Sequence, residues 1–85
     1  ALAQITAYIF IKVKSGTKVE ELIDKIWKIR GVESVSAVTG RHDIIAKVRI
    51  RTLPKGYERI IRKLESMPEI AEFRWYSVLK EWGTI

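Results

Sequence analysis

The stretch Val32-Glu-Ser-Val-Ser-Ala-Val-Thr-Gly-Arg-His-Asp-Ile-Ile-Ala-Lys-Val-Arg-Ile50 lies near the centre of the chain and decides how the rest can fold. Its two halves, residues 32–38 and 43–50, are rich in β-branched residues and are typical of strands. Between them lies a short polar segment in which Gly40 can supply the positive φ that a tight turn needs. One face of the second strand is apolar throughout: Ile44, Ala46, Val48 and Ile50. The stretch therefore predicts a β-hairpin with a buried face.

The sequence before the hairpin predicts an amphipathic helix. Apolar residues recur there at the three-and-four spacing of one helical face: Val19, Leu22, Ile23, Ile26 and Trp27. Thr17, followed three residues later by Glu20, matches a capping box, in which each side chain accepts a hydrogen bond from the other residue's backbone N–H. Gly31, directly after Arg30, suits the left-handed backbone that ends many helices.

The sequence after the hairpin predicts a second helix. It opens near Pro54, which a first helical turn tolerates because its missing N–H would have no partner there. The apolar stripe of this helix is Tyr57, Ile60, Ile61 and Leu64. Pro68 prevents its continuation, since proline disfavours helical geometry at the residue before it.

A strand is predicted at each end of the chain. Residues 5–13 alternate, with Ile5, Ala7, Ile9, Ile11 and Val13 on one face, and residues from about 70 to 80 alternate in the same way. The order β-α-β-β-α-β predicts a ferredoxin-like α+β fold, a four-stranded antiparallel sheet. Right-handed crossovers place both helices on one face of that sheet. We expect a single domain, residues 1–85.

The face of the sheet that carries no helix is predicted to hold an apolar patch. Its members are Tyr8, Phe10, Ile45, Tyr76 and Val78. An uncovered patch of this kind on a small domain usually marks an interface. We therefore expect this face to pack against a second copy in a two-fold dimer. The alternative is that these side chains are scattered and simply tolerate water.

The composition excludes several kinds of chemistry. The 85 residues include no Cys and a single His, which excludes disulfides, thiolate metal sites, thiol catalysis and a multi-histidine metal site within one chain. His42 adjoins Asp43, and neighbours on an extended segment point to opposite sides, so they make a poor catalytic pair. We expect no enzymatic activity, no catalytic residue, no metal and no cofactor.

The chain is basic, with 16 Lys and Arg against 10 Asp and Glu, a net charge of +6 and a pI near 9.8. Such a balance is typical of nucleic-acid binding. The excess is greatest in residues 51–65 but never becomes a run, which favours a solvated, mildly basic face. RNA-recognition modules share the predicted topology and stack bases on sheet aromatics. Only Tyr8 and Phe10 match that pattern, because the third predicted strand has no aromatic residue.

No segment resembles a signal peptide or a membrane span, since the longest uncharged stretch near the start, residues 1–11, is too short to cross a bilayer. Asn is absent and Gln occurs once, while Ile, Lys, Arg and Glu are plentiful. This composition fits a heat-adapted cytoplasmic protein. The chain begins at Ala1 without Met, which leaves processing or truncation open.

The predicted hairpin turn gathers groups that can bind a small molecule: Gly40, Arg41, His42 and Asp43. A zwitterionic ligand needs a binder for its cation beside a binder for its anion, and this tetrapeptide supplies both. The simpler alternative is an ordinary polar hairpin tip.

The segment Gly40-Arg-His-Asp-Ile44, closing a hairpin between apolar strands, resembles the Gly-x-x-Asp signature of the Lrp/AsnC effector-binding domain, also called the RAM domain. Residues Arg30-Gly-Val32 before the second strand and Ser77-Val-Leu-Lys80 in the last one are also similar. The resemblance extends over nearly the whole chain. The chain thus looks like a stand-alone RAM protein, or the effector domain of a longer regulator, without the helix-turn-helix domain of full-length members.

The resemblance implies dimers paired through their sheets, commonly assembled further into octamers, with amino acids or related molecules bound between neighbouring dimers. It implies ligand contacts from Gly40–Asp43 and from Ser77, which matches the second polar position of the family's Thr-x-Ser/Thr stretch. Trp75 stands where the first small polar residue of that stretch usually sits. An indole there would shrink the pocket or favour an apolar ligand. Alternatively, Trp75 is packed in the core or an interface.

These observations favour an amino-acid-responsive oligomerisation module of transcription regulation, in which a ligand bound between subunits alters assembly. The expected partners are an amino acid or related effector, further copies of this chain, and a full-length Lrp/AsnC regulator. We expect no direct DNA binding by this chain and no membrane association. The alternatives are a purely structural oligomerisation partner of a full-length regulator and, third, an RNA-binding module.

Overall fold

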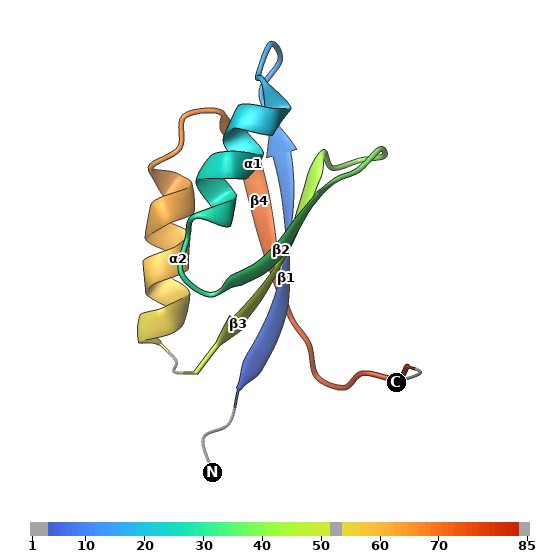
Figure 1. The fold of residues 1–85 in the computed structure, drawn as a ribbon, viewed down its shortest axis with the longest axis vertical. Helices are drawn as coiled ribbons and strands as arrows, with labels where there is room; N and C mark the ends of the chain where they lie inside the picture. The colour runs from blue at the N-terminus through green and yellow to red at the C-terminus, as the bar shows by residue number, and fades with distance from the viewer. Residues whose placement is uncertain (1–3, 52–53, 84–85) are drawn as a thin grey trace.

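Six elements follow one another in the predicted β-α-β-β-α-β order. The computed structural model describes residues 4–51 and 54–83, so the ends of the predicted domain 1–85 lie outside the described residues. The bounds are β1 Ile5–Val13, α1 Val19–Trp27, β2 Val32–Ala37, β3 Ile44–Ile50, α2 Lys55–Glu65 and β4 Ile70–Ser77. Both helices lie on one side of the sheet (Figure 1). The ferredoxin-like α+β fold is confirmed, although the last strand is shorter than predicted.

The four strands form one antiparallel sheet in the order β2-β3-β1-β4, so that β1 is central and β2 and β4 are the edges. Residues directly opposite each other on paired strands point to the same face. Ile9 is opposite both Ala46 and Trp75, and these three face the helices. Phe10 is opposite Ile45 on the other face. The alternation in the sequence therefore predicts the two faces correctly.

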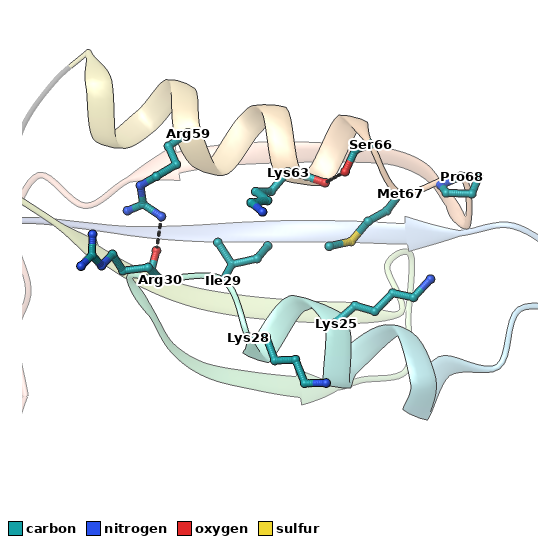
Figure 2. Close-up of a pocket in the computed structure, with 9 residues that line it drawn as sticks. All are labelled: Lys25, Lys28, Ile29, Arg30, Arg59, Lys63, Ser66, Met67 and Pro68. Carbon is teal, nitrogen blue, oxygen red and sulfur yellow. Dashed lines mark hydrogen bonds between the residues drawn. The ribbon is translucent and has the colours of Figure 1, made fainter.

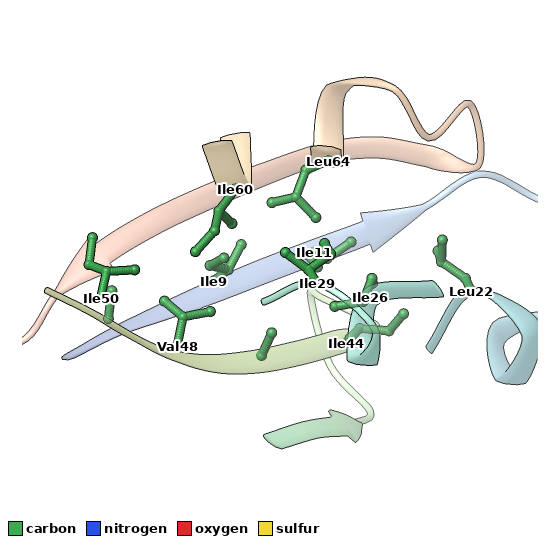
Figure 3. Close-up of a cluster of buried hydrophobic side chains, with 12 residues drawn as sticks. Ile9, Ile11, Leu22, Ile26, Ile29, Ile44, Val48, Ile50, Ile60 and Leu64 are labelled. Carbon is green, nitrogen blue, oxygen red and sulfur yellow. The ribbon is translucent and has the colours of Figure 1, made fainter. Parts of the chain in front are cut away.

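The core lies between the sheet and the helices (Figure 3). It contains twelve buried apolar residues: Ala7, Ile9, Ile11, Leu22, Ile26, Ile29, Ile44, Ala46, Val48, Ile50, Ile60 and Leu64. Burial of one large aliphatic side chain contributes about 1.5–3 kcal/mol. Almost all of these residues lie at alternating positions of β1 and β3 or on the apolar stripe of a helix. The helices therefore cover the face of the sheet on which these strand residues lie, because only there can both sets of apolar side chains leave water.

The predicted capping box at the start of the first helix does not form. α1 begins at Val19, Lys18 is its N-cap residue, and no side chain caps it. A capping box requires Thr17 to be the N-cap, with Glu20 as the third helical residue. With Lys18 in that position, Glu20 is only the second helical residue. The backbone N–H of Thr17 instead donates to the carbonyl of Lys14 at 3.2 Å, within the turn that precedes the helix.

Trp27 is the last residue of the apolar face predicted for α1, and it is not buried. Its side chain is 54% exposed, whereas Leu22 and Ile26 are buried. Trp27 is the last residue of α1, and it lines a shallow hollow together with Val35 of β2. Since β2 is an edge strand, no further strand continues the sheet beneath the indole.

Gly31 joins α1 to β2 with a φ of +101°, which confirms the predicted left-handed position, although α1 already ends at Trp27. The backbone N–H of Arg49 donates to the Gly31 carbonyl at 2.8 Å. A Cβ atom on residue 31 would lie 3.3 Å from the Arg49 carbonyl oxygen. Glycine therefore allows this turn to approach β3 closely.

One ion pair connects α1 to the turn between α2 and β4: Lys25 Nζ lies 2.6 Å from Glu69 Oε2. The hydrogen bond from Lys25, together with a backbone hydrogen bond at Glu69, lowers the pKa of the Glu69 carboxyl below its ordinary value. A carboxyl with a lowered pKa stabilises the fold fully above its unfolded pKa of about 4.3. This contribution is lost as the pH falls through the lowered folded value.

We therefore expect Glu69→Gln to reduce the free energy of unfolding at neutral pH, and to have a progressively smaller effect as the pH falls below about 4. Urea unfolding of both proteins across this pH range measures the difference. An effect of the same size at acid and neutral pH would contradict a stabilising role of the charged pair.

Candidate functional site

The turn between β2 and β3 is fixed against the end of β1. Asp43 Oδ2 accepts a hydrogen bond from the backbone N–H of Val13 at 2.9 Å. The N–H of Asp43 donates to the carbonyl of Ile11, and its carbonyl accepts from the N–H of Val38, both at 2.9 Å. Asp43 thus binds the turn to the central strand through side chain and backbone.

The other three predicted turn residues stay beside Asp43 but differ in exposure. Gly40 has a φ of +139° and is exposed, as is Arg41. His42 is partly buried, and its ring centroid lies 5.5 Å from that of Phe10. Lys12 Nζ donates to the Arg41 carbonyl at 3.3 Å. A guanidinium, an imidazole and a carboxylate therefore come from four consecutive residues at one end of the sheet.

Trp75 and Ser77, the predicted site residues on β4, contact each other. The indole Nε1–H donates to Ser77 Oγ at 2.8 Å. The Trp75 ring also packs edge-to-face on Tyr57 of α2, with ring centroids 4.8 Å apart. Trp75 is partly buried against the core, on the helix-covered side of the sheet. The indole thus lies between β4 and α2, packed against the core.

The structure does not bring these two groups together within one chain. Ser77 is paired with Ala7 of β1, whereas Asp43 is bonded to Val13. These two positions on β1 are six residues apart, which corresponds to about 20 Å along a strand. A small ligand cannot touch the turn and Ser77 of the same chain at once.

The predicted patch on the helix-free face exists as an aromatic cluster. Phe10 packs on Tyr76 with ring centroids 5.3 Å apart in an edge-to-face geometry, and Tyr76 is 49% exposed. Tyr8 is opposite Tyr76 across the strand pair, and Lys47 Nζ lies 5.9 Å from its ring centroid. Ile45 is opposite Phe10 and partly buried. Val78 follows β4, and its N–H donates to the Thr6 carbonyl at 2.8 Å.

Two contacts at these positions were missed by sequence reasoning. The Asp43–Val13 bond joins residues 30 positions apart, and the Trp75–Tyr57 contact joins a strand to the facing helix. The sequence signal for the second was present, because Tyr57 opens the apolar stripe of α2 and so points towards the sheet. The first has no local signal, since it depends on how far β1 extends past the turn.

Other kinds of site find no support in the part of the chain that the structure describes. Within residues 4–51 and 54–83, no three His, Asp or Glu side chains come together in a way that could hold a metal ion. Neither α1 nor α2 is long and apolar enough to span a membrane.

The described part of the chain is a ferredoxin-like sheet with helices on one face, an aromatic cluster on the other and a polar turn at one end. A comparison with protein families identifies the family that has this fold. The Lrp/AsnC ligand binding domain matches residues 6–83, and the chain belongs to this family.

Its relatives are regulators of transcription and small proteins of the same fold. The chain is 29% identical over 82 residues to an uncharacterised HTH-type transcriptional regulator of Pyrococcus abyssi (strain GE5 / Orsay). That match covers 94% of this chain and 51% of the relative, so the chain spans about half of its length. A hypothetical protein of Pyrococcus horikoshii, PHS023, has a crystal structure with a TM-score of 0.78 and 30% identity, covering 91% of this chain and 92% of that one.

A more distant structure shows the same fold. The transcriptional regulator NMB0573 of Neisseria meningitidis, solved in complex with L-Met, has a TM-score of 0.81 and 20% identity. The superposition covers 94% of this chain and 53% of that one.

Substitution of Asp43 tests its role in holding the turn. We expect Asp43→Ala to lower the free energy of unfolding by about 1–3 kcal/mol, because the partly buried N–H of Val13 loses its charged acceptor. Asp24→Ala, on the exposed face of α1, is the matched control and should change it by less than about 0.5 kcal/mol. Urea unfolding measures both. Equal values for the two variants would show that the carboxylate does not hold the turn.

Proposed function

We propose that this domain binds an amino acid or a related small molecule between subunits, and that binding alters the assembly of an Lrp/AsnC-type regulator of transcription. Membership of a ligand-binding family supports the proposal. The relative from P. abyssi is an HTH-type transcriptional regulator, which supports a regulatory context. The N. meningitidis structure contains L-Met, which makes α-amino acids the first ligands to test.

The observation that carries the proposal is the separation of the two predicted groups of site residues. The turn Gly40–Asp43 is bonded to β1 at Ile11 and Val13, whereas Ser77 is opposite Ala7, about 13–20 Å away along the strand. A ligand that contacts both the turn and Ser77 must therefore receive them from different copies of the chain. Such a site exists only in an assembly, so ligand binding and assembly are thermodynamically linked.

The aromatic cluster supports assembly through the helix-free face. Tyr8, Phe10 and Tyr76 are neighbours there, and Ile45 and Val78 extend the patch. Aromatic side chains are enriched at the buried centres of protein interfaces. Pairing of this face with a second copy would cover the cluster and leave both helices on the outside.

The chemistry of the turn suits the two charged ends of an amino acid. The exposed guanidinium of Arg41 can bind a carboxylate through two parallel N–H donors. The carboxylate of Asp43 has acceptor positions beyond the one used by the Val13 N–H, and these can receive an ammonium group. In this proposal Arg41 and Asp43 bind the backbone atoms of the ligand, and the ligand's side chain faces the other subunit.

Isothermal titration against each of the twenty amino acids, paired with sedimentation velocity, tests the proposal. We expect at least one amino acid to bind and to change the sedimentation coefficient. Arg41→Gln should weaken that binding by about 10- to 100-fold, since hydrogen bonds to charged groups are worth about 1.5–3 kcal/mol. Arg62→Gln, on the exposed side of α2, makes the same charge change away from the turn and should leave the affinity unchanged.

A purely structural role is the second candidate, and the Trp75–Ser77 hydrogen bond favours it. The indole N–H already has an acceptor in Ser77 Oγ, so it needs no ligand, and the hydroxyl oxygen uses one of its acceptor sites within the chain. In that case no amino acid would produce heat or change sedimentation, while the chain would still form dimers.

A further inference from the structure

The basic residues of the chain gather on the helix side of the molecule. Three adjoining hollows are lined there by eight Lys and Arg residues, which we call the basic groove: Lys25, Lys28, Arg30, Arg51, Lys55, Arg59, Arg62 and Lys63. Arg49 also borders one hollow, but its side chain alternates with buried Val48 and Ile50 and so belongs to the helix-free face. The eight are half of the 16 Lys and Arg residues of the chain. Arg59 lines all three hollows, so they adjoin one another at this residue. The charge excess is thus concentrated in space although it is dispersed along the sequence.

The two walls of the groove come from segments far apart in the chain. Figure 2 shows Arg59 and Lys63 projecting from α2 towards the end of α1 and the turn after it. Arg59 Nη1 donates to the Arg30 carbonyl at 2.7 Å and so bridges the two walls. Ile29 and Met67 line the largest hollow, of about 650 Å³, together with these basic residues. The bridge uses one of the five N–H donors of Arg59 and leaves its charge in the groove.

Few of these charges are balanced by carboxylates. Among the residues that the structure describes, an ion pair joins Lys25 to Glu69, and no pair is found for the other seven basic residues of the groove. Glu58 is the one acidic residue that lines any of the three hollows in the described part of the chain. Like charges held close together repel one another, so an anion bound there would relieve this repulsion.

We propose that the basic groove binds the phosphodiester backbone of nucleic acid, independently of base sequence. The spacing of the charges favours an extended polyanion over a compact anion. Lys55 and Lys63 lie eight residues apart on α2, which corresponds to about 12 Å along a helix. One strand of duplex DNA carries about three or four charges over that length. The side chains in Figure 2 are spread along the groove and do not converge on one point.

This proposal goes beyond the ligand site and does not depend on it. The groove lies on the helix side, whereas the aromatic cluster lies on the opposite face of the sheet. A dimer formed through that cluster would leave both grooves exposed. The sequence led us to expect no direct DNA binding, because no helix-turn-helix is present to read bases. Contact with the phosphate backbone alone needs no such element.

Fluorescence anisotropy with a short labelled DNA duplex of arbitrary sequence tests the proposal. We expect micromolar binding at low salt, with log K falling against log salt at a slope of about −3 to −4, as for about four neutralised phosphates. The groove variant Lys28→Gln/Lys55→Gln/Lys63→Gln should bind about tenfold or more weakly, with a slope closer to zero by about 2–3. A duplex RNA should behave as the DNA does, because the recognised group is the same.

The control Lys14→Gln/Lys18→Gln/Lys80→Gln removes the same charge from the β1–α1 turn and the C-terminal tail. It should keep most of the affinity and the slope of the wild type. If the triple groove variant fails to fold, Lys55→Gln and Lys63→Gln are measured singly, each with an expected slope change of about 0.9. Three results would overturn the proposal: no binding by the wild type at low salt, the same loss in the control, or tripolyphosphate competing as well as the duplex does.

Discussion

Ile9→Ala is expected to lower the free energy of unfolding by about 2–5 kcal/mol, the range for truncating a buried aliphatic side chain. Ile9 is 1% exposed and lies on the central strand, between Ala46 of β3 and Trp75 of β4. Truncation removes the transfer free energy of three carbon atoms and leaves a cavity that two flanking strands cannot close. For a domain of this size such a loss is a large share of the total stability.

Thermal or urea unfolding of the variant measures this effect, with Ile23→Ala as the control. Ile23 is the same residue type but only partly buried, on the side of α1 near the edge strand. We expect the control to lose about half as much or less, because less apolar surface returns to water. Equal losses would mean that the centre of the sheet is not the best-packed part of the core.

Phe10→Glu is expected to abolish dimerisation, with a dissociation constant raised by about 100-fold or more. Phe10 is at the centre of the aromatic cluster, between His42 and Tyr76. In a two-fold interface each substitution occurs twice, so two carboxylates would be buried together in apolar surroundings. In the monomer Phe10 is only partly buried, so a carboxylate at this position keeps contact with water and costs less there than in the interface.

Sedimentation equilibrium over a range of concentrations measures this effect. The wild type should reach twice the 9.8 kDa chain mass, whereas the variant should stay at the mass of one chain. Trp27→Glu is the control, since it also replaces an aromatic residue by a carboxylate but lies exposed on the helix side. It should dimerise as the wild type does. A wild-type protein that remains monomeric throughout would contradict assembly through this face.

Most of the fold could be predicted from the spacing of apolar residues. One face of each strand or helix is buried, and the residues on that face recur every two positions in a strand and every three or four in a helix. The faces of β1 and β3, the stripe of α2 and the β-α-β-β-α-β order all follow from this spacing. The start of α1 and the exposure of Trp27 did not, since both depend on neighbours in space. The capping box needs Thr17 at the N-cap, and its hydrogen bonds are lost when the helix begins one residue later. Trp27 lies beside an edge strand, so part of its side chain stays exposed to water.

The candidate site could be predicted less completely. The turn residues Gly40–Asp43 are consecutive, so their proximity needs no structure. Their distance from Ser77 was not foreseen, because it depends on which end of β1 each element meets. The basic groove was missed for a related reason. Residues 25–30 and 51–63 are dispersed along the chain, and only the packing of α1 beside α2 brings them together.

The two outer strands limit the ways in which copies of this chain can join. β2 carries Glu33, Ser34 and Ser36, and β4 carries Glu72 and Arg74, all exposed side chains. Charged side chains along an unpaired strand disfavour its extension by a strand from another molecule. Continuous growth of the sheet from chain to chain, which leads to fibrils, is therefore disfavoured at both margins. The aromatic cluster on the helix-free face can therefore take part in a closed dimer, while the charged edge strands disfavour open-ended assembly.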